Sequence, residues 1–191
     1  MHNQDTITGP SFSLKNRLGR VLWSVVSLLL FRYTPNPMHA WRAMILRMFG
    51  AKVGDGVHIY PKAKIWAPWN LELEDQCSAA NGAILYSQGK IRIGRRAIVS
   101  QGAHLCAGTH DYTMPGFPLV TMPISIGEHA WVAAEAFIHA GVTIGEGCVI
   151  GARSVVTKNM PAWTICSGFP CKPIKVRITE DTKEKFYQLQ A

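Results

Sequence analysis

The side chains in this sequence best suited to proton transfer near neutral pH are its seven histidines. One of them, His110, stands between Thr109 and Asp111 at the start of a segment rich in glycine and proline. A histidine in such a segment can act as a general base, removing the proton of a hydroxyl group while its oxygen attacks an electrophile. We therefore predict that His110 is the catalytic residue. Asp111 could orient the imidazole, contact the acceptor or structure the loop.

The other histidines occupy positions for which a structural role is the simpler expectation. They lie in a polar tail (His2), in a basic helical segment (His39), beside regularly spaced aliphatic residues (His58, His104, His139) and in a turn (His129). Cys106 is a conceivable nucleophile. Because it directly follows Leu105, one of those regularly spaced aliphatics, we expect a small packed thiol instead.

A repeat of six residues organises the chain that must position His110. Aliphatic residues occupy every sixth position over one long run: Ile126, Val132, Ile138, Ile144, Ile150 and Val156. Neither a helix nor an ordinary strand has this period, but a coil with three short sides does, each side directing one aliphatic inward. We therefore predict a β-helix over residues 51–178. A β-sandwich would need alternation with period two and hairpin turns, for which only Asn81-Gly82 is a candidate.

The repeat is interrupted once, at the segment that carries His110. Successive coils begin 20 residues apart in the first part of the chain and 18 in the last part, whereas 33 residues separate Ile93 from Ile126. About 15 residues are therefore inserted after Leu105. We expect an excursion loop at about residues 109–123, and loops held on a rigid scaffold commonly carry function.

The first 50 residues differ in character from the repeat. Between Thr6 and Gly54 the chain has no acidic residue, and the cations there supply most of the net charge of +8. The apolar run Val21–Phe31 is too short to span a bilayer, and a second amphipathic helix is predicted from about Met38 to Phe49. These helices either lie on an anionic membrane surface or cap one end of the β-helix, and the two roles are compatible.

Composition narrows the class of protein further. The five cysteines include no Cys-x-x-Cys pair and their number is odd, so neither a disulfide framework nor a metal knuckle is expected. No secretory signal is recognisable and no stripe of bases with interleaved aromatics suggests nucleic acid, so we expect a cytoplasmic protein, or one peripheral at the inner face of the membrane. A short helix is predicted at Thr182–Leu189, within residues 179–191.

Several stretches of the repeat resemble the hexapeptide-repeat acyltransferases, namely Ile126–Trp131, Gly141–Gly145, Gly151–Lys158 and Gly168–Lys172. Within that family the similarity is greatest to polysaccharide O-acetyltransferases of the colanic-acid type. That closer similarity rests on His58–Pro61, Ile65–Asn70, Thr109–Tyr112 and the basic N-terminal helices. The resemblance implies a left-handed parallel β-helix that assembles as a homotrimer. It also implies transfer of an acetyl group from acetyl-CoA to a saccharide hydroxyl. For this transfer we hypothesise direct attack in a ternary complex, and we expect no metal.

The resemblance also implies roles for individual residues. His110 matches the histidine that serves as the base in that family, and Trp131 matches the residue beside the pantetheine arm of acetyl-CoA. The backbone amides of Ala134 and Ala152 would bind that arm, and Lys158 and Lys172 would contact the CoA phosphates. Asn81 lies near the family's acceptor-binding asparagine, although its spacing to Ile93 is one residue shorter than in the galactoside enzymes.

Three other functions remain open at this point. The acceptor could be an antibiotic or another small hydroxyl compound. A metal enzyme similar to the gamma-class carbonic anhydrases could use His104, His110 and His129 as zinc ligands, and elemental analysis would reveal it. A non-catalytic scaffold could keep the β-helix without its chemistry, although an intact Thr109–Tyr112 segment argues against that.

Overall fold

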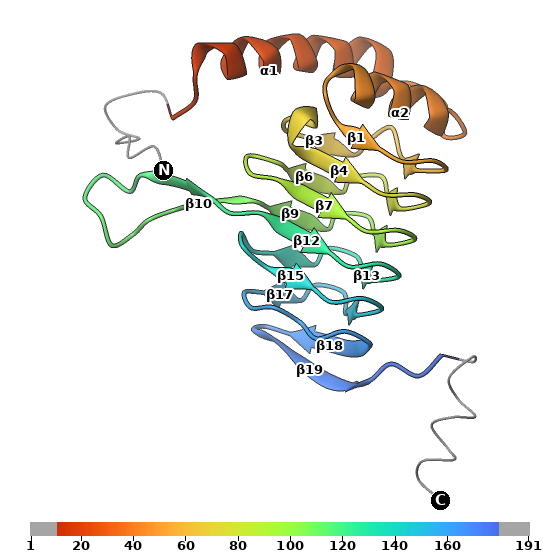
Figure 1. Ribbon diagram of the computed structural model, residues 1–191, viewed down its shortest axis with the longest axis vertical. Helices are drawn as coiled ribbons and strands as arrows, with labels where there is room; N and C mark the ends of the chain where they lie inside the picture. Colours follow the sequence, from red (N-terminus) through yellow and green to blue (C-terminus); the bar gives the residue numbers. More distant parts are fainter. Residues whose placement is uncertain (1–10, 180–191) are drawn as a thin grey trace, which may run out of the picture.

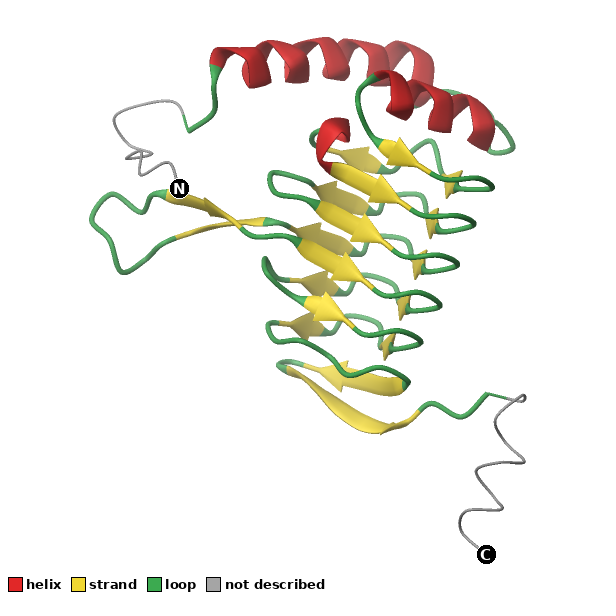
Figure 2. Ribbon diagram, in the orientation of Figure 1, coloured by secondary structure: helices red, strands yellow, loops and turns green. Residues whose placement is uncertain are grey.

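The structure, a computed structural model, describes residues 11–179. It is a parallel β-helix with helices across one end and a hairpin projecting from its side (Figures 1 and 2). The expected parallel β-helix is therefore confirmed. The predicted helix at Thr182–Leu189 lies outside the described residues.

The strands form three faces. The first face holds β1 (Lys52–Val53), β4 (Leu71–Leu73), β7 (Ile91–Ile93), β12 (Ile124–Ile126) and β15 (Thr143–Ile144). The second holds β2 (His58–Ile59), β5 (Ser78–Ala79), β8 (Ile98–Val99), β13 (Trp131–Val132), β16 (Val149–Ile150), β18 (Thr164–Gly168) and β19 (Cys171–Val176). The third holds β3 (Lys64–Ile65), β6 (Ile84–Tyr86), β9 (His104–Cys106), β14 (Phe137–Ile138) and β17 (Val155–Val156). Strands within a face pair in parallel, except that β19 folds back antiparallel on β18.

The core is the column of aliphatic residues that the six-residue spacing predicts. All six positions from Ile126 to Val156 are fully buried. Burying one such side chain stabilises the folded state by roughly 1.5–3 kcal/mol relative to leaving it exposed, so stacked coils stabilise one another. Val53 and Ile65 in the first coil are only partly buried, whereas Ile59 of the same coil, which lies under α2, is fully buried.

The helical end is built from α1 (Leu14–Val26), a π-helical turn η1 (Ser27–Phe31) and α2 (His39–Met48), with a short 3-10 helix η2 (Pro68–Asn70) below. Trp23 anchors α1 to the first coil. Its ring contacts Phe31 and Phe49, and its Nε1 donates to the carbonyl oxygen of Ile65 at 2.8 Å. Within residues 11–179, no helix combines the length and hydropathy needed to cross a bilayer.

The excursion between β9 and β12 is more ordered than a loop. Residues Gly108–His110 form β10 and Leu119–Thr121 form β11, which pair antiparallel, so the segment is a two-stranded arm (Figure 1). His110 is the last residue of β10 and pairs with Leu119. We call the edge of the prism that carries this arm, between the third and first faces, the His110 corner. The edge between the second and third faces, where Ala152 lies, is the Ala152 corner.

Candidate active site

The His110 ring is oriented by a hydrogen bond to the tip of its own hairpin. Its Nδ1 lies 2.7 Å from the carbonyl oxygen of Phe117. A carbonyl can only accept a hydrogen bond, so Nδ1 carries the proton and Nε2 of the neutral ring is left as an acceptor. Phe117 has a positive φ of 46°, the left-handed backbone of a tight turn. The hairpin thus presents His110 in the form that a general base requires.

A cavity of about 340 Å³ lies beside His110 and brings together three separate segments. The hairpin contributes His110 and Leu119, and the corner after β6 contributes Gln88. Ser11, Phe12 and the first turns of α1, with Arg17 and Arg20, complete its lining. The cavity is therefore polar and positively charged, with the imidazole in its wall.

Gln88, Arg17 and Arg20 are residues that the sequence alone did not identify. Gln88 precedes Gly108 by 20 residues, the coil repeat of that part of the chain, and this spacing could have placed it under the hairpin. A Cβ atom on Gly108 would lie 1.9 Å from Oε1 of Gln88, so any side chain there would displace Gln88. The Gln88 side chain is itself held in place, because its Nε2 donates a hydrogen bond to the Tyr86 hydroxyl at 3.0 Å. The sequence contains no comparable spacing for Arg17 and Arg20, since they reach the cavity only when α1 packs on the first coil.

Asp111 turns away from the imidazole in this structure. Its Oδ1 accepts hydrogen bonds from the backbone N–H of Thr113 at 2.9 Å and from the Thr113 hydroxyl at 2.6 Å. The Thr113 hydroxyl and amide both lower the pKa of the Asp111 carboxyl. Of the roles open to Asp111, this geometry supports the one in which it structures the hairpin tip.

The residues implied in acetyl-CoA binding lie mostly on the second face and at the Ala152 corner. Trp131 is 46% exposed, and its Nε1 donates to the Ser100 hydroxyl at 2.9 Å. Ala134 and Ala152 stack one coil apart. Within residues 11–179 neither of their backbone N–H groups donates a hydrogen bond, so both can serve a ligand. Lys172, at the start of β19, pairs with Ser167 near the same corner.

The remaining implied residues do not converge on one place within a single chain. Lys158 follows β17 and so lies at the His110 corner, whereas Asn81 lies at the Ala152 corner. Oδ1 of Asn81 accepts a hydrogen bond from the backbone N–H of Lys62 at 3.0 Å, which ties two coils together. The structure therefore separates two sets of residues by the width of the third face: His110 with Lys158, and Trp131 with Ala134, Ala152 and Lys172.

The other histidines suggested as zinc ligands, and the suggested nucleophile Cys106, lie where they contribute to the fold. Burial lowers the pKa of His104, and its Nε2 is buried without a hydrogen-bond partner within residues 11–179. His129 lies in the turn between the first and second faces. Those described residues contain no group of three or more His, Cys, Asp or Glu placed to hold a metal, so the three suggested zinc ligands do not meet in one chain. The Cys106 thiol donates to the Gly108 carbonyl at 3.3 Å, as a packed thiol would.

Comparison with known sequences identifies similar proteins over most of the chain. Residues 123–158 match the family model for the bacterial transferase hexapeptide (six repeats). A protein of Escherichia coli (strain K12) named as a colanic acid biosynthesis acetyltransferase, WcaF, is 43% identical over 157 residues, covering 82% of this chain and 86% of that protein. The galactoside O-acetyltransferase of the same organism is 26% identical, covering 81% of this chain and 76% of that enzyme.

Solved structures agree with the sequence comparison. A maltose O-acetyltransferase from Clostridium difficile 630 superposes with a TM-score of 0.79 at 26% identity, covering 87% of this chain and 90% of that one. A hexapeptide-repeat acetyltransferase from Vibrio cholerae, solved with acetyl-CoA, has the same fold with a TM-score of 0.80, covering 89% of this chain and 93% of that one at 18% identity.

Proposed function

Because this chain belongs to the hexapeptide-repeat acetyltransferases, which use acetyl-CoA, we propose that it acetylates a saccharide hydroxyl with His110 as general base. The observation that supports this base is the hydrogen bond from Nδ1 of His110 to the Phe117 carbonyl, which leaves Nε2 free to accept a proton. The saccharide acceptor, either an exopolysaccharide unit or a lipid-linked glycan precursor, is suggested by the names of the similar enzymes and by the polar cavity beside the imidazole.

The proposed reaction is a direct transfer within a ternary complex. Nε2 of His110 takes the hydroxyl proton as the acceptor oxygen attacks the thioester carbonyl carbon. A C–O bond forms, and the tetrahedral intermediate collapses with cleavage of the C–S bond. The imidazolium then returns its proton to the sulfur of CoA. No covalent acetyl-enzyme is needed, so His110 acts as base and then as acid.

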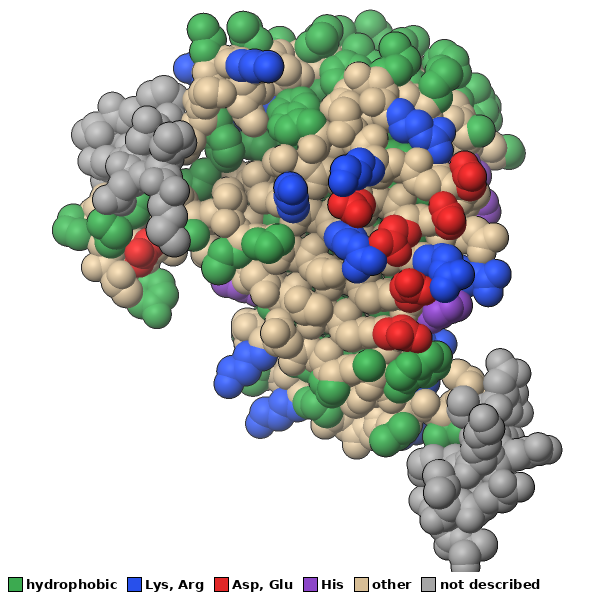
Figure 3. All heavy atoms as spheres, viewed as in Figure 1, with side chains coloured by type: hydrophobic (Ala, Val, Ile, Leu, Met, Phe, Trp, Pro, Cys, Tyr) green, Lys and Arg blue, Asp and Glu red, His purple; other side chains and the backbone are tan. Residues whose placement is uncertain are grey.

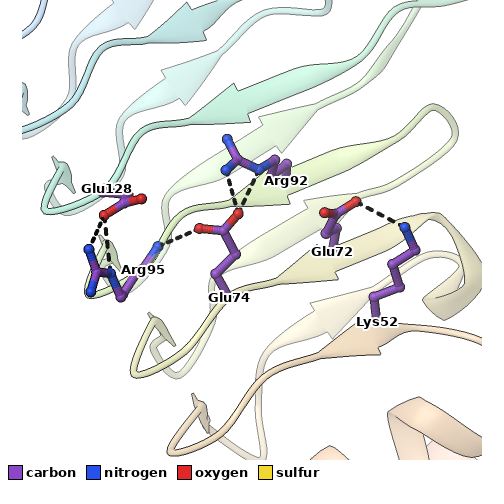
Figure 4. A network of polar contacts seen from close by, with 6 residues as sticks. All are labelled: Lys52, Glu72, Glu74, Arg92, Arg95 and Glu128. Carbon is purple, nitrogen blue, oxygen red and sulfur yellow. Dashed lines mark hydrogen bonds and ion pairs between the residues drawn. The ribbon is translucent and has the colours of Figure 1, made fainter.

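The separation of the two sets of residues supports the homotrimer as part of the proposal. One copy would offer its His110 corner, and a neighbouring copy would offer Trp131 and its Ala152 corner, completing a site between subunits. The first face is unsuited to such contact because ion pairs cover it: Lys52–Glu72, Arg92–Glu74 and Arg95–Glu128 (Figure 4). The second face instead presents the apolar residues Ile98 and Trp131, each 46% exposed.

Mixed oligomers provide a direct test of the shared site. When a His110→Ala chain is co-expressed with a Trp131→Ala/Lys172→Glu chain, about a quarter of the wild-type activity should return, since one interface in four then combines two intact halves. The measurement is CoA release by purified mixed oligomers, with each variant alone as control. Activity no higher than that of the two parents would mean that each chain contains a complete site.

Binding of the donor tests the acetyl-CoA site without knowledge of the acceptor. Trp131→Ala removes an exposed aromatic surface and should weaken acetyl-CoA binding about tenfold or more, measured by calorimetry. Trp163→Ala removes a tryptophan that is also partly exposed but directly precedes β18, at the edge between the first and second faces, and it should change binding less than twofold. Equal effects of the two substitutions would argue against the placement of the pantetheine arm on Trp131.

We also propose that the helical end lies on an anionic membrane surface. Along α1 and η1, exposed apolar residues recur every three or four positions: Leu14, Leu18, Leu22, Val25 and Leu29. Figure 3 shows hydrophobic side chains crowded over this end of the molecule. The same segment has cations and no acidic residue between Thr6 and Gly54, so its charge complements anionic headgroups.

Sedimentation with vesicles tests this contact. The protein should bind vesicles containing phosphatidylglycerol, and Leu22→Glu/Leu29→Glu should abolish that binding because it places two carboxylates on the apolar stripe. Ile174→Glu is the matched control, since Ile174 is 63% exposed but lies on β19 at the opposite end. If binding persists in the double variant, or if the substitutions change only the size of the oligomer, the stripe is a protein interface instead.

A further inference from the structure

A second cavity, of about 420 Å³, lies between α1 and the first coil of the β-helix. Four cationic side chains from three segments line it: Arg20 in α1, Arg32 directly after η1, and Lys62 and Lys64 just before and at the start of β3. The hydroxyl-bearing Ser24 and Ser27 lie on the same wall. Such a lining suits an anion with several oxygen atoms.

No acidic side chain of the described residues offsets the positive charge of this cavity. Within residues 11–179, none of the four cations forms an ion pair with a carboxylate. The first face of the β-helix is different, because there the cations lie against Glu72, Glu74 and Glu128 (Figure 4). Like charges around one cavity repel each other, and an anionic ligand would relieve that repulsion.

Arg20 connects this cavity to the one beside His110, because it lines both. Its guanidinium is fixed over the Trp66 ring at 4.4 Å and over the Phe12 ring at 5.5 Å, and its Nε donates to Oδ1 of Asn16 at 3.1 Å. Its two terminal nitrogens make no hydrogen bond within the described part of the chain. A group bound by Arg20 in the second cavity therefore lies next to whatever occupies the first.

We propose that the cavity lined by Arg20, Arg32, Lys62 and Lys64 is a subsite for the diphosphate group of a glycosyl diphosphate acceptor. This inference rests on the acetyl transfer proposed above. The diphosphate occupies the cationic cavity, and the attached sugar extends past Arg20 to the imidazole of His110. Leu28 lines the cavity and is also part of the exposed apolar surface of the helical end. Both a soluble nucleotide sugar and a lipid diphosphate sugar carry the required diphosphate group attached to a sugar.

Binding of inorganic pyrophosphate tests the subsite directly. The titration is made in saturating CoA, so that the phosphate site of the donor is already filled. Lys62→Ala/Lys64→Ala should weaken pyrophosphate binding by about tenfold or more, because two charge-assisted contacts are lost. The matched control, Lys15→Ala/Lys90→Ala, removes two exposed lysines that line neither cavity and should change binding less than twofold. Absent binding, or equal affinities in all three proteins, would overturn the proposal.

The kinetics distinguish the two sources of diphosphate. With a nucleotide sugar or a lipid diphosphate sugar as acceptor, the cavity variant should have a KM raised about tenfold at little-changed kcat, while free monosaccharides should show no difference. The substrate with the higher wild-type kcat/KM identifies the source. If pyrophosphate binds as expected but no acceptor is acetylated, the proposed function fails and the subsite stands. If free sugars are acetylated without any pyrophosphate binding, only the subsite fails.

Discussion

Replacement of His110 by alanine is expected to lower kcat for acetyl transfer by about 10²- to 10⁴-fold while the affinity for acetyl-CoA changes less than twofold. The reason is that the hydrogen bond from Nδ1 to Phe117 leaves Nε2 of the neutral ring as the proton acceptor, and none of the described residues that line the cavity beside it carries a carboxylate as a substitute. His110→Gln should lose as much, because an amide cannot take up the hydroxyl proton. The assay follows loss of the thioester, and calorimetry follows donor binding.

Asp111→Asn is the comparison that separates chemistry from loop structure. The asparagine keeps one oxygen that can accept the hydrogen bonds of Thr113, so the hairpin tip should persist and activity should fall less than about fivefold. A loss as large as that of His110→Ala would mean that the Asp111 charge acts on the imidazole or on the acceptor. Retention of substantial activity by His110→Ala would remove the general-base mechanism altogether.

The β-helix could be predicted in detail because its rule is local. One aliphatic residue per side is enough to define the column, and the aliphatic residue at every sixth position from Ile126 to Val156 is fully buried. Elements outside the repeat could not be predicted from its spacing. The six-residue spacing says nothing about how α1 lies across the first coil, which depends on Trp23 contacting Phe31 and Phe49 and bonding Ile65.

Only part of the candidate site could be proposed from the sequence. His110 stood out because the insertion interrupts the repeat, whereas Ala134 and Ala152 were implied by the resemblance to the acyltransferases and not by the spacing. Arg20 did not stand out, because it meets Gln88 and His110 only through docking of a helix whose position no periodicity encodes. The expected loop also proved to be a hairpin. Its order depends on pairing between β10 and β11, two strands of three residues each with no alternation long enough to recognise.

The largest effect on stability is expected from Arg42, a fully buried arginine in α2. Its Nε donates to the carbonyl of Ile59 in β2 at 2.6 Å, and its Nη1 donates to the Thr34 hydroxyl at 2.7 Å and to the Pro35 carbonyl at 2.9 Å. Its Nη2 donates to the Asn36 carbonyl. One guanidinium thus joins the connection between the two helices to the first coil. Burial lowers the pKa of Arg42, and within residues 11–179 hydrogen bonds rather than a carboxylate hold its charge.

Arg42→Met should therefore lower the free energy of unfolding by about 3–4 kcal/mol, since it keeps an apolar stem but leaves buried carbonyl oxygens without donors. Arg42→Lys should lose roughly half as much, because an ammonium group reaches fewer of the acceptors. The matched control is Arg47→Met in the same helix. Arg47 also donates to two backbone carbonyls, those of Val53 and Gly54, but its side chain is 45% exposed, so its loss should cost about 1 kcal/mol or less. Denaturation at one fixed protein concentration measures the free energy of unfolding of all three variants. Equal losses for Arg42→Met and Arg47→Met would mean that the helices contribute to stability through apolar contacts such as those of Trp23, and that the buried guanidinium is dispensable.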